Sequence, residues 1–272
     1  MTYDLVIRDA RVDGARVDVG IAGERIAEIG TGLPGPVLDA GGRLVSPAFV
    51  QPHIHLDKVR TGTLVGPNRS GTLAEAISIS HRVKRGATPD EIRARAGEVI
   101  RAAVIAGTTA IRSHVDVDTI GGLKGLRGVA AARDDHADLC EIQLVAFPQE
   151  GIWRDPGTDE LMAEAMKEGA DVVGGMPHWE DGLDEARRHI EFCLDLARRH
   201  DADVDMHVDE TDDPYWRSFE ILVEEAERRD WGRERLPGTC ARWLPGRTTT
   251  RTRSSTAPPV PASWSPPTRR PT

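Results

Sequence analysis

The chain has 272 residues, of which 39% are apolar and 29% charged, and its formal net charge is −9 with histidine counted as neutral. This length and apolar content suffice for a packed core, in one large α/β barrel or two medium domains, and they exclude collagen, coiled coil and wholesale disorder. No run of about 18 uncharged apolar residues occurs, and the start, MTYDLVIRDARV, is neither basic nor apolar enough for a signal peptide, so we expect a cytoplasmic protein without membrane contact.

The first predicted element is a small antiparallel sheet near the N-terminus. Residues 3–30 alternate short apolar stretches with Gly and Asp turns, which is the pattern of successive short strands. A few more strand-like residues follow before the pattern changes at residue 44.

From residue 44 onward, apolar β-rich runs alternate with amphipathic helices. The clearest helix start is Thr88-Pro89-Asp90-Glu91, which combines an N-cap, a proline at the first helical position and first-turn acids, and Gly107 ends this helix. The predicted strands cover residues 44–56, 108–117, 139–147, 171–177 and 203–209. The later predicted helices cover about residues 122–134, 158–168, 182–200 and 215–229.

These five βα units predict an α/β fold in which helices cover a parallel sheet. Any site is then expected at the carboxyl ends of the strands. Five units exceed half of a (β/α)8 barrel but cannot close one. An open doubly wound sheet is the alternative architecture, although no G-x-G-x-x-G or Walker-type loop follows the first strand to hold a nucleotide phosphate.

Unusual polar residues collect where the predicted strands end. Because the carboxyl ends of parallel strands meet at one edge, these side chains are expected to share one rim. In chain order they are His53 and His55, His114 and Asp116, Gln149 and Glu150, His178, and His207 to Glu210.

Three of these histidines form a candidate metal site. His53 and His55 are two residues apart, so on a strand their side chains point to the same side, and His207 from another strand adds a third nitrogen. An H-x-H pair by itself is more often structural than metal-binding. Together with the third histidine it predicts a site for Zn²⁺ or Fe²⁺ with open positions, where a bound water becomes more acidic.

Two further rim residues fit roles beside such an ion. Glu210 lies three residues beyond His207, where a proton shuttle is wanted, although it also belongs to the acidic run 209–213 and fits a solvated acid. Gln149 has an amide donor and acceptor that suit a polar heterocycle, and it equally fits an ordinary loop glutamine.

The remaining histidines are less informative. His114 and His178 each fit a satisfied core histidine as well as a functional group. His81 and His189 fall on predicted helices, where a surface position is the simpler expectation.

Residues 1–236 resemble the amidohydrolase superfamily and, within it, the cytosine deaminase group. The resemblance is carried by six segments in the same order and spacing: VSPAFVQPHIHLDK (45–58), SGTLAEAI (70–77), HVDVD (114–118), QLVAFPQEG (143–151), ADVVGGMPH (170–178) and HVDETDD (207–213). It implies a (β/α)8 TIM-type barrel over residues 48–236, present only in part, beside a small N-terminal β-sandwich domain over residues 1–47.

The resemblance also implies a chemistry, namely hydrolysis of a carbon–nitrogen bond other than a peptide bond. His53, His55 and His207 correspond to ligands of one divalent ion, Fe²⁺ or Zn²⁺, that activates water for attack on an amidine-like ring carbon. Glu210 corresponds to the acid that moves protons.

For the substrate, the resemblance implies a nitrogen heterocycle. Gln149 corresponds to the residue that holds its polar edge, and Leu73, in SGTL, to a position in the pocket wall. The reaction implied is loss of ammonia from cytosine or a related ring, as in pyrimidine metabolism, or of an alkylamine from an N-alkyl triazine-type ring. The oligomeric state stays open, with a homo-oligomer of the full-length form as one option.

The resemblance stops near residue 236. The family pattern continues with a sixth-strand histidine and an eighth-strand aspartate, but no histidine follows His207 and no aspartate follows Asp230. Residues 237–272 contain six Arg, eight Pro, eight Thr and no acid, so residues 1–236 carry a charge of −15 and nucleic acid is not an expected partner. The tail reads as a low-complexity, disordered segment or as a frameshift product.

The genetic code gives the frameshift hypothesis a concrete form. The codons for residues 238–244 (GTCARWL), read two bases later, permit His-Val-Cys-Ala-Leu-Ala when the degenerate bases are favourable. The preceding RLPG permits Thr-Ala-Gly, and the combination resembles the family's sixth-strand motif. We therefore expect a frameshift near residues 234–238, which the nucleotide sequence tests directly.

Two other interpretations accompany this one. The chain as written fits a catalytically inactive fragment that binds metal weakly and aggregates through uncovered strands. It also fits a regulatory module whose basic tail binds an acidic partner. The three cysteines, odd in number and far apart, argue against a disulfide framework or a Cys-based zinc site.

Overall fold

The computed structural model describes residues 2–211 and 213–231. Its N-terminal part is a four-stranded sheet in the order β3-β2-β1-β4, in which β1–β2 and β2–β3 pair antiparallel and β4 pairs parallel to β1. The strands are β1 (Leu5–Val12), β2 (Ala15–Ala22), β3 (Arg25–Gly30) and β4 (Val37–Asp39). Asp13 and Gly14 both have positive φ, as a tight hairpin between β1 and β2 requires. The predicted antiparallel sheet is therefore confirmed, with one parallel strand added.

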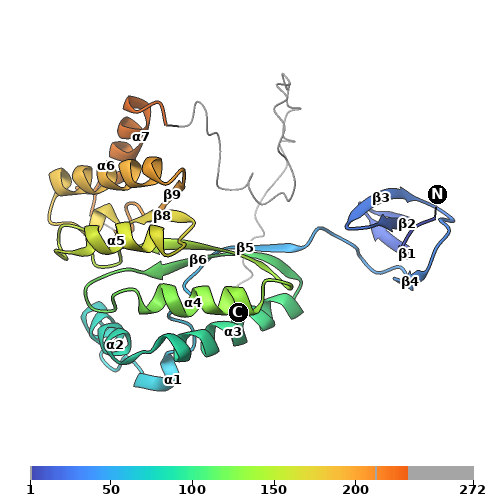
Figure 1. Ribbon diagram of the computed structural model, residues 1–272, viewed down its shortest axis with the longest axis horizontal. Coiled ribbons are helices and arrows are strands. Elements are labelled where there is room, and N and C mark those ends of the chain that lie inside the picture. The colour runs from blue at the N-terminus through green and yellow to red at the C-terminus, as the bar shows by residue number, and fades with distance from the viewer. Residues whose placement is uncertain (1, 212, 232–272) are drawn as a thin grey trace, which may run out of the picture. The chain divides into compact units, whose positions relative to one another are not determined.

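The second sheet has five parallel strands and follows in chain order, β5-β6-β7-β8-β9 (Figure 1). The strands are β5 (Phe49–Ile54), β6 (Thr108–Asp116), β7 (Glu141–Phe147), β8 (Val172–Gly175) and β9 (Asp203–Met206). Doubly wound sheets reverse their strand order at a switch point, and these five strands show no reversal. The sheet thus has the sequential order of a barrel wall and differs from the open alternative.

Helices separate these strands and account for the predicted alternation. They are α1 (Gly62–Val65), α2 (Leu73–Gly86), α3 (Pro89–Ile105), α4 (Lys124–Asp135), α5 (Thr158–Lys167), the 3₁₀ turn η1 (Pro177–Trp179), α6 (Leu183–Arg199) and α7 (Ser218–Arg228). α3 begins with a complete capping box between Thr88 and Glu91, and Gly107 follows its end with a φ of 96°. The predicted α/β class and its five βα units are confirmed.

The core lies between this sheet and its helices. β6 is buried along almost its whole length, as expected of a parallel strand covered on both faces. Apolar side chains of the core include Leu56, Ile92, Ile100, Ile111, Leu126, Leu144, Met162 and Leu196.

Several predictions concern residues that the structure leaves undescribed. The basic tail 237–272, the proposed frameshift and Cys240 lie outside the described residues. The boundary between a β domain ending at residue 47 and a barrel beginning at residue 48 stays a prediction. Within the described residues, no helix has both the length and the apolar character to span a bilayer.

Candidate metal centre at the strand ends

Four histidines meet at the carboxyl ends of the parallel strands. β5 delivers His53 and, one residue past its end, His55, while β6 delivers His114. His207 follows β9, and its backbone N–H donates to the Gly175 carbonyl at 2.8 Å, which extends the pairing between β8 and β9. Parallel pairing therefore brings together residues up to 154 positions apart in the chain.

The imidazoles of His53, His55 and His207 each place one nitrogen within 4.8 Å of the others. The ring centroids of His53 and His207 are 4.7 Å apart, and those of His53 and His55 are 5.2 Å apart. His114 is completely buried and lies 4.2 Å from His53 by ring centroid, so it belongs to the same cluster. The structure thus gathers the three predicted ligands, while their role as ligands stays a prediction.

The polar atoms of this cluster fit a divalent cation. Nδ1 of His55 and Nε2 of His207 are buried and have no hydrogen-bond partner. Burial lowers the pKa of His53, His55 and His207, to about 3 for His55, so all three are neutral at pH 7. Neutral imidazoles with unpaired nitrogens are the form in which histidine binds metal.

A polar layer lies directly beneath the imidazoles. Arg112, two residues before His114, donates to Oδ2 of Asp205 at 2.8 Å and to the side-chain oxygen of Gln143. Oδ1 of Asp205 is 3.4 Å from Nε2 of His114. Burial opposes ionisation of Asp205, but its contacts with His114 and Arg112 prevail and lower its pKa to about 2. Asp205 is therefore ionised and forms an ion pair with Arg112 next to the cluster.

A second group of close ligand atoms, from His55, Asp57 and Asp116, is less suited to a metal. Both oxygens of Asp116 already face ammonium groups: one accepts from Lys58 at 2.7 Å, and the other forms an ion pair with Lys84 at 2.7 Å. Lysine thus occupies the places that a cation would take. Asp57 is buried, and burial followed by the charge of Asp116 raises its pKa to about 7.

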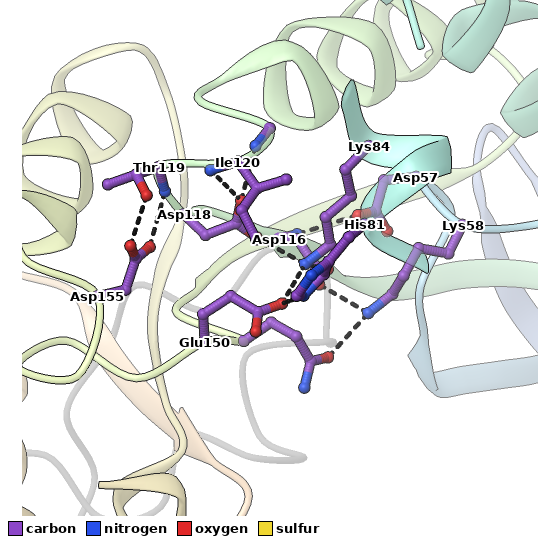
Figure 2. A network of polar contacts seen from close by, with 12 residues as sticks. Asp57, Lys58, His81, Lys84, Asp116, Asp118, Thr119, Ile120, Glu150 and Asp155 are labelled. Carbon is purple, nitrogen blue, oxygen red and sulfur yellow. Dashed lines mark hydrogen bonds and ion pairs between the residues drawn. The ribbon is translucent and has the colours of Figure 1, made fainter. Parts of the chain in front are cut away.

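These lysines belong to a larger charged network, shown in Figure 2. Lys84 also contacts Asp118 at 2.6 Å and Glu150 at 2.8 Å. Glu150 lies 3.1 Å from Nε2 of His81; this nitrogen is buried, and the side chain as a whole is 23% exposed. His81 therefore lies only partly at the surface, where a surface position was expected.

The other predicted site residues are placed as follows. Gln149 is half-buried just after β7, and its Oε1 accepts from Lys58 at 2.9 Å. The side chain of Glu210 is 57% exposed, with a carboxylate oxygen 3.4 Å from Nδ1 of His207. Leu73 is the first residue of α2, and its side chain lies outside the described part of the structure. The roles assigned to these three residues stay predictions.

His189 corrects a second expectation, since it is fully buried where a surface position was predicted. Its Nε2 accepts from the Met176 N–H at 3.0 Å, so Nδ1 carries the proton and donates to Glu180 at 2.7 Å. Glu180 also accepts from three backbone N–H groups, those of Ile152, Trp153 and Arg154. The pair joins the segment after β7 to α6. His178 is buried too, on η1, outside the imidazole cluster.

Sequence reasoning missed several contributors to the site. Arg112 and Asp205 each stand two residues before a strand-end histidine, so the period of two along a strand would have indicated them. Lys58 stands inside the quoted segment 45–58. Lys84 gives no local signal, because only the packing of α2 brings it to the rim.

Comparisons with known proteins support the same architecture. No family model matches the chain. N-isopropylammelide isopropyl amidohydrolase of Pseudomonas sp. (strain ADP) is 35% identical over 218 residues, which are 76% of this chain and 53% of that protein. The crystal structure of 5-methylcytosine deaminase from Klebsiella pneumoniae liganded with 5-fluorocytosine matches with a TM-score of 0.76 and 40% identity, over 84% of this chain and 56% of that one.

A second solved structure, N-isopropylammelide isopropylaminohydrolase from Burkholderia multivorans, matches with a TM-score of 0.73 and 32% identity. It is covered to 58%, and this chain to 83%. The chain therefore spans about half the length of the relatives that it matches. Over that half, the predicted fold class and resemblance are confirmed.

Proposed function

Since the chain belongs to the amidohydrolase superfamily, we propose that it carries the metal-binding half of a site that hydrolyses a carbon–nitrogen bond of a nitrogen heterocycle. The first candidate reaction is deamination of cytosine or a closely related ring. The observation that carries the proposal is the convergence of His53, His55 and His207, with two buried nitrogens that have no hydrogen-bond partner.

In this proposal the three imidazoles hold one divalent ion, Zn²⁺ or Fe²⁺. When bound, such an ion supplies a nucleophile from water at neutral pH. The chain's own contribution is to present neutral nitrogens. Asp205, which is paired with Arg112, lies 3.4 Å from Nε2 of His114 and favours positive charge on His53 and His207.

Glu210 is the proposed proton carrier. Its carboxylate is exposed toward solvent and close to His207, so it can exchange protons with water and remain near the reacting atoms. Gln149 is proposed to hold the polar edge of the ring, and Leu73 to form part of the pocket wall.

The test is a measurement of metal content and ammonia release on the purified chain. We expect one equivalent of bound Zn²⁺ or Fe²⁺ per chain. We expect ammonia from cytosine only if the chain supplies every residue that the reaction needs. A chain that holds no metal when supplied with either ion would exclude the proposal. His200→Ala is the matched control, because it removes an exposed histidine at the end of α6.

An N-alkyl ring is the second candidate substrate, with an alkylamine as the leaving group. Two of the compared proteins are named for isopropylammelide, and this similarity favours the alternative over other rings. Release of isopropylamine from N-isopropylammelide, with none of ammonia from cytosine, would decide for it.

A chain that binds metal without turnover is the third candidate. It is favoured by the absence of any histidine after His207 in the sequence. One equivalent of metal without product from either ring would support it.

A cytoplasmic location belongs to the same set of proposals, and the free, buried Cys140 and Cys193 are compatible with that reducing compartment.

A further inference from the structure

Lys84 has an unusual environment for a helix lysine. It lies in the last turn of α2, yet its side chain is only 7% exposed. Its ammonium contacts three carboxylates, Asp116 at 2.7 Å, Asp118 at 2.6 Å and Glu150 at 2.8 Å (Figure 2). Two of the three N–H donors of the ammonium are hydrogen-bonded, to Asp118 and Glu150, and the ion pair with Asp116 holds its third side.

The carboxylates also keep Lys84 charged. Burial alone lowers the pKa of a lysine, but Asp116 and Asp118 outweigh that effect and raise the pKa of Lys84 above its ordinary value. Removing the ammonium would leave three buried or half-buried carboxylates short of one cation.

Asp116 connects Lys84 with Lys58 at the edge of the sheet. One of its oxygens faces Lys84, and the other accepts from Lys58 at 2.7 Å. The Asp116 N–H donates to Oδ2 of Asp57 at 3.1 Å, so the backbone of Asp116 is held as well. The position of Lys58 thus depends on a carboxylate that Lys84 fixes.

Lys58 in turn sets the orientation of the Gln149 amide. Its Nζ lies 2.9 Å from Oε1 of Gln149. Because an ammonium cannot accept a hydrogen bond, the amide atom facing it must be the oxygen. The amide nitrogen then points the other way, 3.2 Å from the weak acceptor Sδ of Met176.

We infer that Lys84 is a positioning residue, which through Asp116 and Lys58 turns the Gln149 amide so that it offers N–H donors to a ligand. Lys84 also reaches the same segment directly, through Glu150. As applied to substrate, this deepens the proposed function and rests on it. The ring edge that meets Gln149 must then present an acceptor, a carbonyl oxygen or an unprotonated ring nitrogen.

The positioning is testable on the chain itself by NMR of the Gln149 side-chain amide, assigned through its loss in Gln149→Glu. Lys84→Met should move this resonance pair toward free-amide shifts and speed its proton exchange by about tenfold. Lys58→Met should give the same spectrum, and Lys84→Arg should restore part of the shift. The matched control is Lys167→Met, which removes a lysine with a 65% exposed side chain on α5.

An unchanged Gln149 amide in Lys84→Met overturns the inference. If Lys84→Met does not fold, NMR of the unsubstituted chain tests the inference instead. The Lys84 ammonium must then give a protected ¹⁵N signal coupled to carboxylates, and a freely exchanging ammonium overturns the inference instead.

Ring binding separates this inference from the proposed function. With Zn²⁺ present, the chain should prefer cytosine over aniline, an amino-substituted ring that has neither a carbonyl oxygen nor a ring nitrogen, and Lys84→Met should reduce that preference by about tenfold. A preference that Lys84→Met leaves unaltered contradicts the donor assignment. Failure of both rings to bind, with the amide signature intact, counts against the proposed function alone.

Discussion

At the scale of single residues, substitutions can distinguish the histidines that are proposed to bind metal from Glu210, the proposed proton carrier. His53 lies on β5 and His207 directly follows β9, the two end strands of the five-stranded sheet, so replacing both by Ala removes a proposed ligand at each of these strands. We expect metal affinity to fall by at least about tenfold for each lost ligand.

Glu210→Gln should behave differently, because Glu210 does not belong to the group of three histidines whose nitrogens lie close together. Metal content should be retained, while any ring hydrolysis falls by about 10²-fold. Metal analysis and ammonia release measured on the same preparations check both expectations. Loss of metal in Glu210→Gln would contradict the division of roles.

Glu180 provides a prediction of pH dependence. Burial opposes its ionisation, but the hydrogen bond from His189 and those from the backbone prevail, and the pKa of Glu180 is lowered. A carboxylate with a lowered folded-state pKa stabilises the fold above its unfolded pKa, near 4.5, and this contribution is lost as the pH falls below that value.

Glu180→Gln should therefore lower the free energy of unfolding at pH 7 by about 2–4 kcal/mol, because a single amide oxygen cannot accept all four hydrogen bonds. The difference from the unsubstituted chain should shrink as the pH falls below 4.5. Denaturant unfolding at several pH values measures it, with exposed Asp181→Asn as control. If the two chains differed in their free energy of unfolding by the same amount at every pH, the stabilising role assigned to the ionised Glu180 carboxylate would be contradicted.

At the scale of elements, the contact between α3 and α4 depends on one glycine. A Cβ on Gly128 would lie 2.7 Å from Cβ of Ile92 and 2.8 Å from the Pro89 carbonyl oxygen. Gly86, also helical, has no atom within 4 Å of the same position.

We expect Gly128→Ala to lower the free energy of unfolding by about 1–3 kcal/mol through overpacking. Gly86→Ala should leave it unchanged or raise it by up to about 1 kcal/mol, because alanine restricts the unfolded chain. Equal effects of the two substitutions in denaturant titrations would show that helix propensity, and not close packing, governs this contact.

At the scale of the whole molecule, the end strand β5 of the five-stranded sheet is largely exposed, while the other end strand, β9, is half-buried. Phe49 on β5 is 64% exposed, although parallel strands are normally covered on both faces. Among the described residues, β5 and β9 each have a neighbouring strand on one side only. Such edges favour association with further strands.

We expect the chain to self-associate at about 10 μM, and Phe49→Lys to shift it toward monomer. Ile105→Lys is the control, since it removes an even more exposed apolar side chain from the end of α3. Light scattering after size-exclusion chromatography measures both. A monodisperse unsubstituted monomer at that concentration would contradict the expectation.

The sequence by itself determined the alternation of strands and helices and the identity of the strand-end residues. Both depend on local patterns: apolar periodicity sets the elements, capping residues such as Thr88 set their ends, and parallel strands that alternate with helices must end at one rim. The segments around His53, His55 and His207 therefore indicated the family and the candidate metal site.

Only the tertiary structure decided what surrounds these residues. The pairing of Arg112 with Asp205 and the position of Lys84 at the rim depend on packing between segments tens of residues apart. The burial of His189 depends on the packing of α6 against β8 and η1. Local periodicity carries no information about such distances. A charged side chain on a helix has the same sequence pattern whether it faces water or three carboxylates, and only the fold determines which surroundings it meets.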